Sequence, residues 1–295
     1  MKAKIYDRLA TVIFVFIALI LFSLVIGLFS YIFFNGFQKL SLDFLTNPSS
    51  NIRAGGGIRD QLFNSLYILF ITMLIVIPLG ISGGIYMAEY AKPNKFTEFI
   101  RSCIEVLSSL PSIVIGMFGL LVFVNMTGWG NTIIGGALAL TILNLPVIVR
   151  TSEDAIRSVP KELKEASLAL GTTHWYTIKN VLLPKAMPAI ITGAILASGR
   201  IFGEAAALLF TSGLSTPRLN YLDWNPFSDT SPLNIFRPAE TLAVHIWSLN
   251  TQGIIPDVQE ISQGAATLLI IAVLAFNVFA RLIGTILYKK MTATK

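Results

Sequence analysis

The sequence has little charge and almost no cysteine. Only 13% of its 295 residues are charged, whereas 54% are hydrophobic and the mean hydropathy is +0.71. A chain with this composition cannot cover itself with enough polar surface to form an ordinary water-soluble domain, so we expect an integral membrane protein. The single cysteine, Cys103, cannot form a disulfide within the chain, and its position beside an apolar run predicts a packed, unreactive thiol.

The sequence also lacks the short motifs of common enzyme sites. It contains no GxxxxGK[ST] phosphate-binding loop, no GxSxG turn and no HExxH helix. The glycines at residues 55–57 have neither the spacing nor the lysine of a nucleotide site, and His174 and His245 have no second histidine or cysteine at ligand spacing. We therefore expect a protein that is not an enzyme and that holds no metal or other cofactor.

Long apolar segments predict an all-α, polytopic membrane protein with six transmembrane helices. The first segment carries no charged residue, and its helical length of about 37 Å exceeds a hydrocarbon core of about 30 Å. The second contains Pro78, Gly80, Gly83 and Gly84, which either kink a membrane helix or allow another helix to approach closely. The six predicted spans are residues 10–34, 62–88, 106–124, 131–149, 189–213 and 265–288.

The basic residues predict how these spans are oriented. The net charge is +6, but the basic residues are scattered between apolar segments and form no stripe, so we expect no nucleic-acid partner. The termini and the segments between spans two and three and between spans four and five hold 15 Lys and Arg, against 5 in the opposite segments. By the positive-inside rule both termini are cytoplasmic and the acidic loop at residues 214–262 is external. Within that loop, residues 239–249 form an amphipathic piece that we expect at the membrane interface.

One strongly charged stretch, residues 159–188, keeps a helical pattern and lies between two apolar spans. Its first helix is expected to end at Gly171, because glycine tolerates the left-handed conformation that follows a helix end. Thr172 or Thr173 can cap a second helix, which Pro184 is expected to end. The sequence therefore predicts a polar helical hairpin with a sharp bend at Gly171, on the cytoplasmic face.

Arg200 and Glu204 are the only ionisable residues deep inside a predicted span. An Arg at the centre of a membrane helix costs about 2.5 to 3.5 kcal/mol on insertion scales, so it normally has a partner and faces a bundle interior or a wet path. The i,i+4 spacing predicts that Glu204 is that partner. Either Arg200 contacts an anion in transit while Glu204 limits how tightly it is held, or the pair only fixes helix packing. Arg150, at the predicted cytoplasmic end of the fourth span, is explained by interfacial anchoring alone.

The hairpin carries Glu165, Ala166 and Ser167, then Gly171, and then Leu183 and Pro184. This set of residues resembles the EAA motif of the transmembrane subunits of ABC importers, in which the third position is usually Ala and here is Ser. In that family the hairpin is the coupling helix that docks on a cytoplasmic ATPase subunit, and the glycine makes its bend.

Three further stretches look like those of phosphate-specific ABC permeases of the PstA type: residues 109–119, 145–154 and 198–213. The similarity covers most of the chain from about Leu62 onward. It implies a single permease domain over residues 1–295 with a type I-like importer fold. Within this domain the core is about 62–288, the coupling hairpin about 151–188 and the external loop about 214–262. It also implies that Arg150, Arg200 and Glu204 line the phosphate path.

The function that the resemblance implies is phosphate import driven by ATP, in a cell membrane of bacterial or archaeal type. The expected partners are a second, homologous permease, two cytoplasmic ATPase subunits, an external phosphate-binding protein, the lipid bilayer and inorganic phosphate. Two alternatives remain open at this point. One is a permease for another oxyanion such as sulfate or molybdate, and the other is a phosphate-responsive regulatory membrane protein that does not transport.

Overall fold

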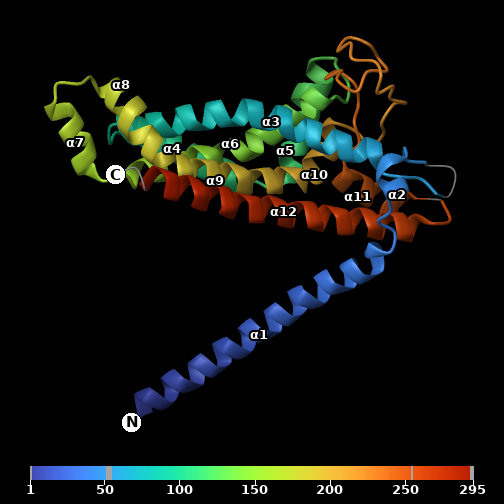
Figure 1. Ribbon diagram of the computed structural model, residues 1–295, viewed down its shortest axis with the longest axis horizontal. Helices are drawn as coiled ribbons and strands as arrows, with labels where there is room; N and C mark the ends of the chain where they lie inside the picture. The colour runs from blue at the N-terminus through green and yellow to red at the C-terminus, as the bar shows by residue number, and fades with distance from the viewer. Residues whose placement is uncertain (1, 51–54, 254, 293–295) are drawn as a thin grey trace.

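The computed structural model describes residues 2–50, 55–253 and 255–292, and in these residues every regular element is helical. Long helices lie side by side in a bundle, and one helix diverges from it (Figure 1). The longer helices are α1 (Lys2–Phe37), α3 (Arg59–Ile85), α4 (Lys95–Ser109), α6 (Ile133–Arg157), α9 (Leu183–Phe202) and α12 (Val258–Thr292). The shorter helices are α2 (Leu42–Thr46), α5 (Ser112–Gly119), α7 (Lys161–Ala169), α8 (His174–Thr177), α10 (Ala206–Thr211) and α11 (Leu242–Gln252). Three π-helical turns are η1 (Tyr86–Tyr90), η2 (Leu120–Met126) and η3 (Ile178–Leu182).

The prediction of an all-α, polytopic membrane fold is confirmed. In the part of the chain that the structure describes, five continuous helical stretches are long and apolar enough to cross a bilayer, and a bent pair of helices passes the same test as one broken span. The continuous stretches are Tyr6–Phe37, Arg59–Tyr90, Ile133–Arg157, His174–Phe202 and Val258–Ile286. The broken pair is Lys95–Ser109 with Ser112–Met126.

Helix α6 is the most buried of these spans, and α3 packs closely along it. A Cβ atom on Gly80 would collide with the side chain of Ile148, and a Cβ on Gly83 would lie 3.0 Å from Val149. The glycines of the second span therefore let α3 approach the backbone of α6. Of the two effects that the sequence left open, a kink or a close helix approach, this is the close approach. Pro78 lies inside α3 without ending it.

The third predicted span, residues 106–124, is wrong as a single straight helix. The chain bends by 100° between α4 and α5, because Leu110 precedes Pro111 and takes an extended conformation (ψ 136°) that a helix cannot contain. The part after the bend, Ser112–Met126, is about 22 Å long at 1.5 Å per residue, shorter than a hydrocarbon core of about 30 Å. Cys103 lies on α4 and is exposed, not packed.

The fifth predicted span, residues 189–213, is also wrong in its limits. Helix α8, the turn η3 and α9 run on from His174 to Phe202, so Pro184 does not end the second helix of the hairpin. Proline is tolerated in the first turn of α9, directly after the wider turn η3. The helix stops instead at Gly203, and the short helix α10 follows after a break.

The hairpin is therefore shorter than the predicted range of 151–188. Residues 151–157 belong to α6 and residues 183–188 to α9, and η3 packs into the bundle through the buried Ile178 and Leu182, which leaves α7, the bend and α8 as the part that projects. In Figure 1 this part lies at the same end of the bundle as the described ends of α1 and α12. The described ends of α1 and α12 and the hairpin thus lie at one end of the bundle, and the loop after α10 lies at the opposite end (Figure 1). That the shared end is cytoplasmic stays a prediction.

Helix α1 diverges from the bundle along most of its length (Figure 1). None of the residues in its most apolar stretch is buried. It touches α12 near its C-terminal end, where Thr267 Oγ1 donates a hydrogen bond to the carbonyl of Ile32 (2.9 Å) and Gly36 packs against Gln263. An apolar helix this exposed needs lipid or another protein around it.

Candidate substrate path and coupling hairpin

The bend of the hairpin has the geometry that the sequence predicts. Helix α7 ends at Ala169 with Leu170 as its C-cap, and Gly171 follows with a φ of +80°. The amide of Gly171 donates to the carbonyl of Leu168 (2.9 Å), which satisfies one of the last carbonyls of the helix. Thr173 then caps α8, because its Oγ1 accepts from the amide of Tyr176 (3.2 Å). Of the two candidate caps, Thr173 is the one used.

Three hydroxyl groups hold the two arms of the hairpin together. Ser167 Oγ on α7 lies 2.9 Å from Thr172 Oγ1 and 3.0 Å from Thr177 Oγ1, and the two threonine oxygens are 3.1 Å apart. Ser167 is the one buried residue of α7. The Ser that departs from the usual EAA pattern thus has a structural role that the sequence did not reveal: it links α7 to α8.

The rest of α7 and the start of α8 present side chains to solvent. Glu165 and Ala166 are exposed. Leu170 is 84% exposed and Trp175 58% exposed, and Leu163, Leu168 and Tyr176 are exposed as well. Large apolar side chains gathered on a projecting polar hairpin are typical of a protein-binding surface. Two motif residues do not belong to this surface, because Leu183 and Pro184 are half-buried in the first turn of α9.

Arg200 and Glu204 do not form the predicted ion pair. Arg200 lies in the last turn of α9, whereas Glu204 lies beyond Gly203, where that helix has ended. Glu204 Oε1 instead accepts hydrogen bonds from the amides of Ala206 (3.1 Å) and Ala207 (3.5 Å) at the start of α10. The i,i+4 spacing does not bring Arg200 and Glu204 together, because the helix ends at Gly203 between them. Arg200 is exposed on the surface of the chain and has no ion pair with any residue that the structure describes.

The break that separates these two residues is packed against the broken third span. A Cβ on Gly116 of α5 would lie 2.9 Å from the Cα of Ala207, and Gly119 packs against Thr211 of α10. Irregular backbone at membrane depth is tolerated where protein covers it or where it borders a wet path. Helices α5 and α10 thus cover one another, and Arg200 lies in the last turn of α9, just before the break between α9 and α10.

Arg150 does not end its helix, because α6 continues to Arg157. It borders a small cavity of about 90 Å³ together with Arg101, Glu105 and Asp154. The nearby Glu153 is shared by two arginines, with Oε1 lying 2.6 Å from Arg101 Nη2 and 2.9 Å from Arg157 Nε. Arg150 itself is exposed and has no ion pair among the described residues.

Arg150 and Arg200 lie at different levels of the bundle. Gly193 of α9 packs against Thr151 of α6, which fixes the register of these two helices. Arg200 is seven residues beyond Gly193, or about 10 Å further along α9. The two arginines therefore do not form a single compact anion site in this chain.

A buried polar cluster that the sequence did not reveal lies at the opposite end from the hairpin. His245 of α11 contacts Glu240 (Nδ1 to Oε1, 3.0 Å), and Gln61 Nε2 of α3 donates to the other oxygen of Glu240 (2.9 Å). Beside them Arg237 Nη2 donates to Asn64 Oδ1 (2.8 Å), and burial lowers the pKa of Arg237 to about 10. These contacts fasten α11 and the loop after α10 onto α3.

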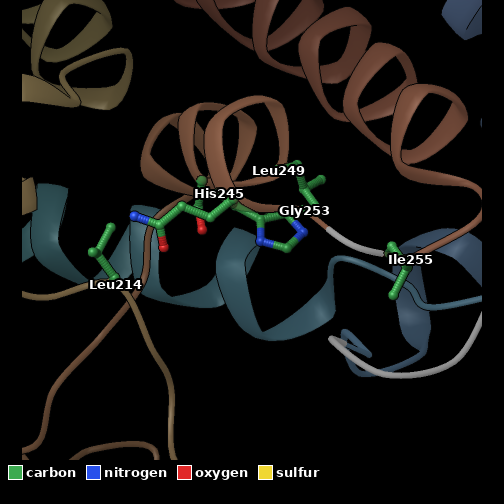
Figure 2. A pocket seen from close by; sticks show the side chains of 7 residues that line it. Leu214, His245, Leu249, Gly253 and Ile255 are labelled. Carbon is green, nitrogen blue, oxygen red and sulfur yellow. The ribbon is translucent and has the colours of Figure 1, made fainter.

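His245 also lines a pocket of about 230 Å³. In Figure 2 its side chain comes from α11, with Leu214 on one side of the pocket and Ile255 on the other. The described residues contain no group of three or more His, Cys, Asp or Glu side chains that could hold a metal ion. Helix α11 is largely buried against its neighbours, so residues 239–249 are not the surface helix that the amphipathic pattern predicted.

The chain matches a known family over most of its length. Residues 80–293 match the family described as "Binding-protein-dependent transport system inner membrane component". The chain is 70% identical over 293 residues to the probable ABC transporter permease protein YqgI of Bacillus subtilis strain 168, covering 99% of this chain and 100% of the relative. It is 34% identical over 270 residues to the phosphate transport system permease protein PstA of Haemophilus influenzae, covering 88% of this chain and 89% of the relative.

Solved structures show the same fold at low sequence identity. A chain of the bacterial alginate ABC transporter, solved with an alginate pentasaccharide-bound periplasmic protein, aligns with a TM-score of 0.62 at 16% identity, covering 97% of this chain and 95% of that one. A chain of the MetNI methionine ABC transporter in an inward-facing conformation aligns with a TM-score of 0.60 at 18% identity, covering 76% of this chain and 93% of that one. The chain therefore belongs to the family of binding-protein-dependent transport system inner membrane components and is a multi-pass transmembrane permease subunit of an ABC importer.

Proposed function

We propose that this chain is the permease subunit of an ATP-driven phosphate importer and forms half of its translocation path. Phosphate as the substrate is supported by the PstA relative, which is 34% identical over most of both chains. Three stretches that resemble phosphate permeases, including the one that carries Arg200, support it as well. The chain has no P-loop, so ATP hydrolysis belongs to a separate partner subunit.

Coupling to that partner rests on one structural observation: the hairpin projects from the bundle and leaves its apolar side chains uncovered. We assign Leu163, Leu170 and Trp175, with Glu165 and Ala166 beside them, to the surface that meets the ATPase subunit. Gly171 makes the bend and Ser167 keeps its shape. Leu183 and Pro184 connect the hairpin to α9 and so carry its movement toward Arg200.

Arg200 is the residue we assign to the phosphate path. An unpaired guanidinium at a break in a membrane span is costly unless it borders water or an anion, and its planar fork matches phosphate oxygens. Glu204 holds the break open by capping α10, which differs from the role that the sequence suggested. Arg150 lies about 10 Å nearer the hairpin and would meet the anion at a later point of the same path.

The complete assembly contains a second, homologous permease, two cytoplasmic ATPase subunits and an external phosphate-binding protein in the cell membrane. Both termini and the hairpin are cytoplasmic in this assembly, as the distribution of Lys and Arg predicts. When ATP closes the ATPase dimer, the hairpins move together and the spans rearrange between outward-facing and inward-facing states.

Uptake by proteoliposomes that contain the whole assembly tests the substrate. The lumen holds ATP, the binding protein is outside, and labelled phosphate, sulfate and molybdate are compared at equal concentration. We expect phosphate to accumulate in preference to the other two oxyanions. Preferential accumulation of sulfate or molybdate would support another oxyanion permease, and ATP hydrolysis that responds to phosphate without any accumulation would support a regulatory role.

A further inference from the structure

One buried carboxylate touches both arms of the hairpin. Glu89, whose side chain is 9% exposed, lies in η1 at the end of the second span. Its Oε2 atom is 2.6 Å from Nζ of Lys164 on α7 and 3.0 Å from Nε2 of His174 at the start of α8. An ionised carboxylate only accepts hydrogen bonds, so Nε2 of His174 carries the proton in this contact. The ring of Tyr90 lies against the ring of His174, with centroids 5.1 Å apart.

Helix α7 is separated from the transmembrane helices by a cavity of about 350 Å³. Glu89 and Ile156 border this cavity on the bundle side, and Lys164 and Leu168 border it on the hairpin side. Because of this gap, α7 has little apolar packing against the bundle, and Ser167, its one buried residue, bonds within the hairpin. Among the described residues, the ion pair of Lys164 with Glu89 is the polar contact that crosses the gap.

The element that carries Glu89 is stiff. Helix α3 and η1 form one helical stretch of 32 residues, Arg59–Tyr90. Its glycines pack against α6, and Arg157 Nη2 of α6 donates to the carbonyl of Met87 in η1 (3.0 Å). A displacement of Glu89 would therefore shift the end of α3 as a body and would carry the α3–α6 contact with it.

We propose that Glu89 is the positioning residue through which the hairpin moves the second membrane span. This inference rests on the proposed function, because it takes the hairpin to be the element that an ATPase subunit displaces. The hairpin then acts on the bundle at three points. Two are covalent, the short link from α6 into α7 and the continuation of α8 through η3 into α9. The third is the Glu89 contact onto α3. Both arms of the hairpin are fixed to the same carboxylate, so the hairpin moves as a unit and α3 follows it.

A distance measurement in the assembled complex tests this directly. The complex is prepared with Cys103→Ser and with spin labels at two exposed positions outside the proposed ATPase surface, Glu162 on α7 and Lys92 just after η1. The label distance is measured without nucleotide and with ATP bound. In the otherwise wild-type complex we expect the same narrow distribution in both states, and in Glu89→Gln a broader distribution that changes with ATP. A wild-type distance that changes between the two states, or an unchanged narrow distribution in Glu89→Gln, would overturn the proposal.

The ratio of phosphate taken up to ATP hydrolysed distinguishes a positioning role of Glu89 from a role in stability alone. We expect Glu89→Gln to retain assembly and ATP hydrolysis but to lower phosphate uptake per ATP by about fivefold or more, the lower end of usual coupling factors. The matched control is Glu98→Gln, an exposed carboxylate on α4, which should leave the ratio unchanged. The reciprocal exchange, Glu89→Lys with Lys164→Glu, should recover uptake relative to either single reversal. Failure of the exchange to recover any uptake would contradict the proposal.

The two proposals fail in different ways. The distance measurement needs no transported ion, so it tests Glu89 whatever the substrate is. If the wild-type complex carries no phosphate, the proposed function is wrong, and the distances still decide whether α3 follows the hairpin.

Discussion

Gly84 on α3 lies directly against Ser152 on α6. A Cβ atom on Gly84 would collide with the Cβ of Ser152 and would lie 2.9 Å from the amide nitrogen of Glu153. The two helices therefore meet backbone to backbone only a few residues from Glu89 and Glu153, whose ion pairs hold the hairpin and α4. This contact packs α3 closely against α6 at the hairpin end of the bundle.

A larger residue at position 84 should separate α3 from α6. Because the obstacle includes backbone atoms that cannot rotate away, we expect Gly84→Val to destabilise the protein by about 1 to 3 kcal/mol or more. Thermal unfolding in detergent measures this. The control is Gly27→Ala on the exposed helix α1, where a new Cβ meets nothing within 4 Å and the unfolding temperature should not fall. Equal effects of the two substitutions would contradict the close α3–α6 contact.

Ser167→Ala should loosen the hairpin without unfolding the bundle. The substitution removes the hydroxyl bonds to Thr172 and Thr177, while Thr172 still bonds to Thr177 and to the carbonyl of Ser167. We expect a local loss of about 1 kcal/mol, seen as faster hydrogen exchange in α7 and unchanged exchange in α6. Ser108→Ala, on an exposed site of α4, is the matched control. Unchanged exchange in α7 would show that the hydroxyl cluster does not hold the two arms.

Arg200→Gln should abolish most transport at almost no cost in stability. Arg200 is exposed and unpaired among the described residues, so its loss should change the free energy of unfolding by less than about 0.5 kcal/mol. Arg200→Lys should restore transport in part, because it keeps the charge but not the planar fork. Arg218→Gln, exposed in the external loop, is the control. Normal uptake in Arg200→Gln, or a large loss of stability, would contradict a path role.

Arg237→Met should destabilise the end of the bundle opposite the hairpin. The guanidinium is buried and donates to Asn64 Oδ1 (2.8 Å) and to the carbonyls of Pro232 (3.0 Å) and Pro238 (3.2 Å). Leaving these acceptors buried and unpaired should cost about 2 to 4 kcal/mol. Because α11 and the loop are fastened there, protease should cut the loop faster in the variant. A variant with wild-type stability and cutting rate would contradict this role of Arg237.

The sequence predicted the parts of this fold that depend on local chemistry. Charge-free runs located the spans, and Gly171 was identified as the bend because a positive φ after a helix end favours glycine. The breaks after Leu110 and after Phe202 were missed. The hydrophobic pattern continues across both breaks, and the breaks are stabilised by packing between α5 and α10, which the pattern of a single segment does not contain.

The candidate functional residues divide in the same way. The hairpin residues Glu165, Ala166 and Gly171 could be named from the sequence because their motif lies within one short stretch, and their role in coupling stays a prediction. The predicted ion pair of Arg200 with Glu204 was wrong, because the helix that was expected to run through both residues ends between them. Glu89 was not found at all, since its partners Lys164 and His174 lie 75 and 85 residues away, and a single sequence carries no sign of such contacts.

Phosphate transport and its coupling through the hairpin are tested most directly by ATP-driven uptake of labelled phosphate by the whole assembly, with the wild type compared to Gly171→Pro. Proline fixes φ near −65°, whereas Gly171 has a φ of +80°, and proline also removes the amide that bonds to Leu168. If the hairpin couples ATP hydrolysis to transport, the wild type accumulates phosphate only with ATP. The variant then accumulates no phosphate, although it still inserts in the membrane. Equal ATP-driven uptake by both proteins would contradict coupling through the hairpin, and no uptake by the wild type would contradict phosphate transport.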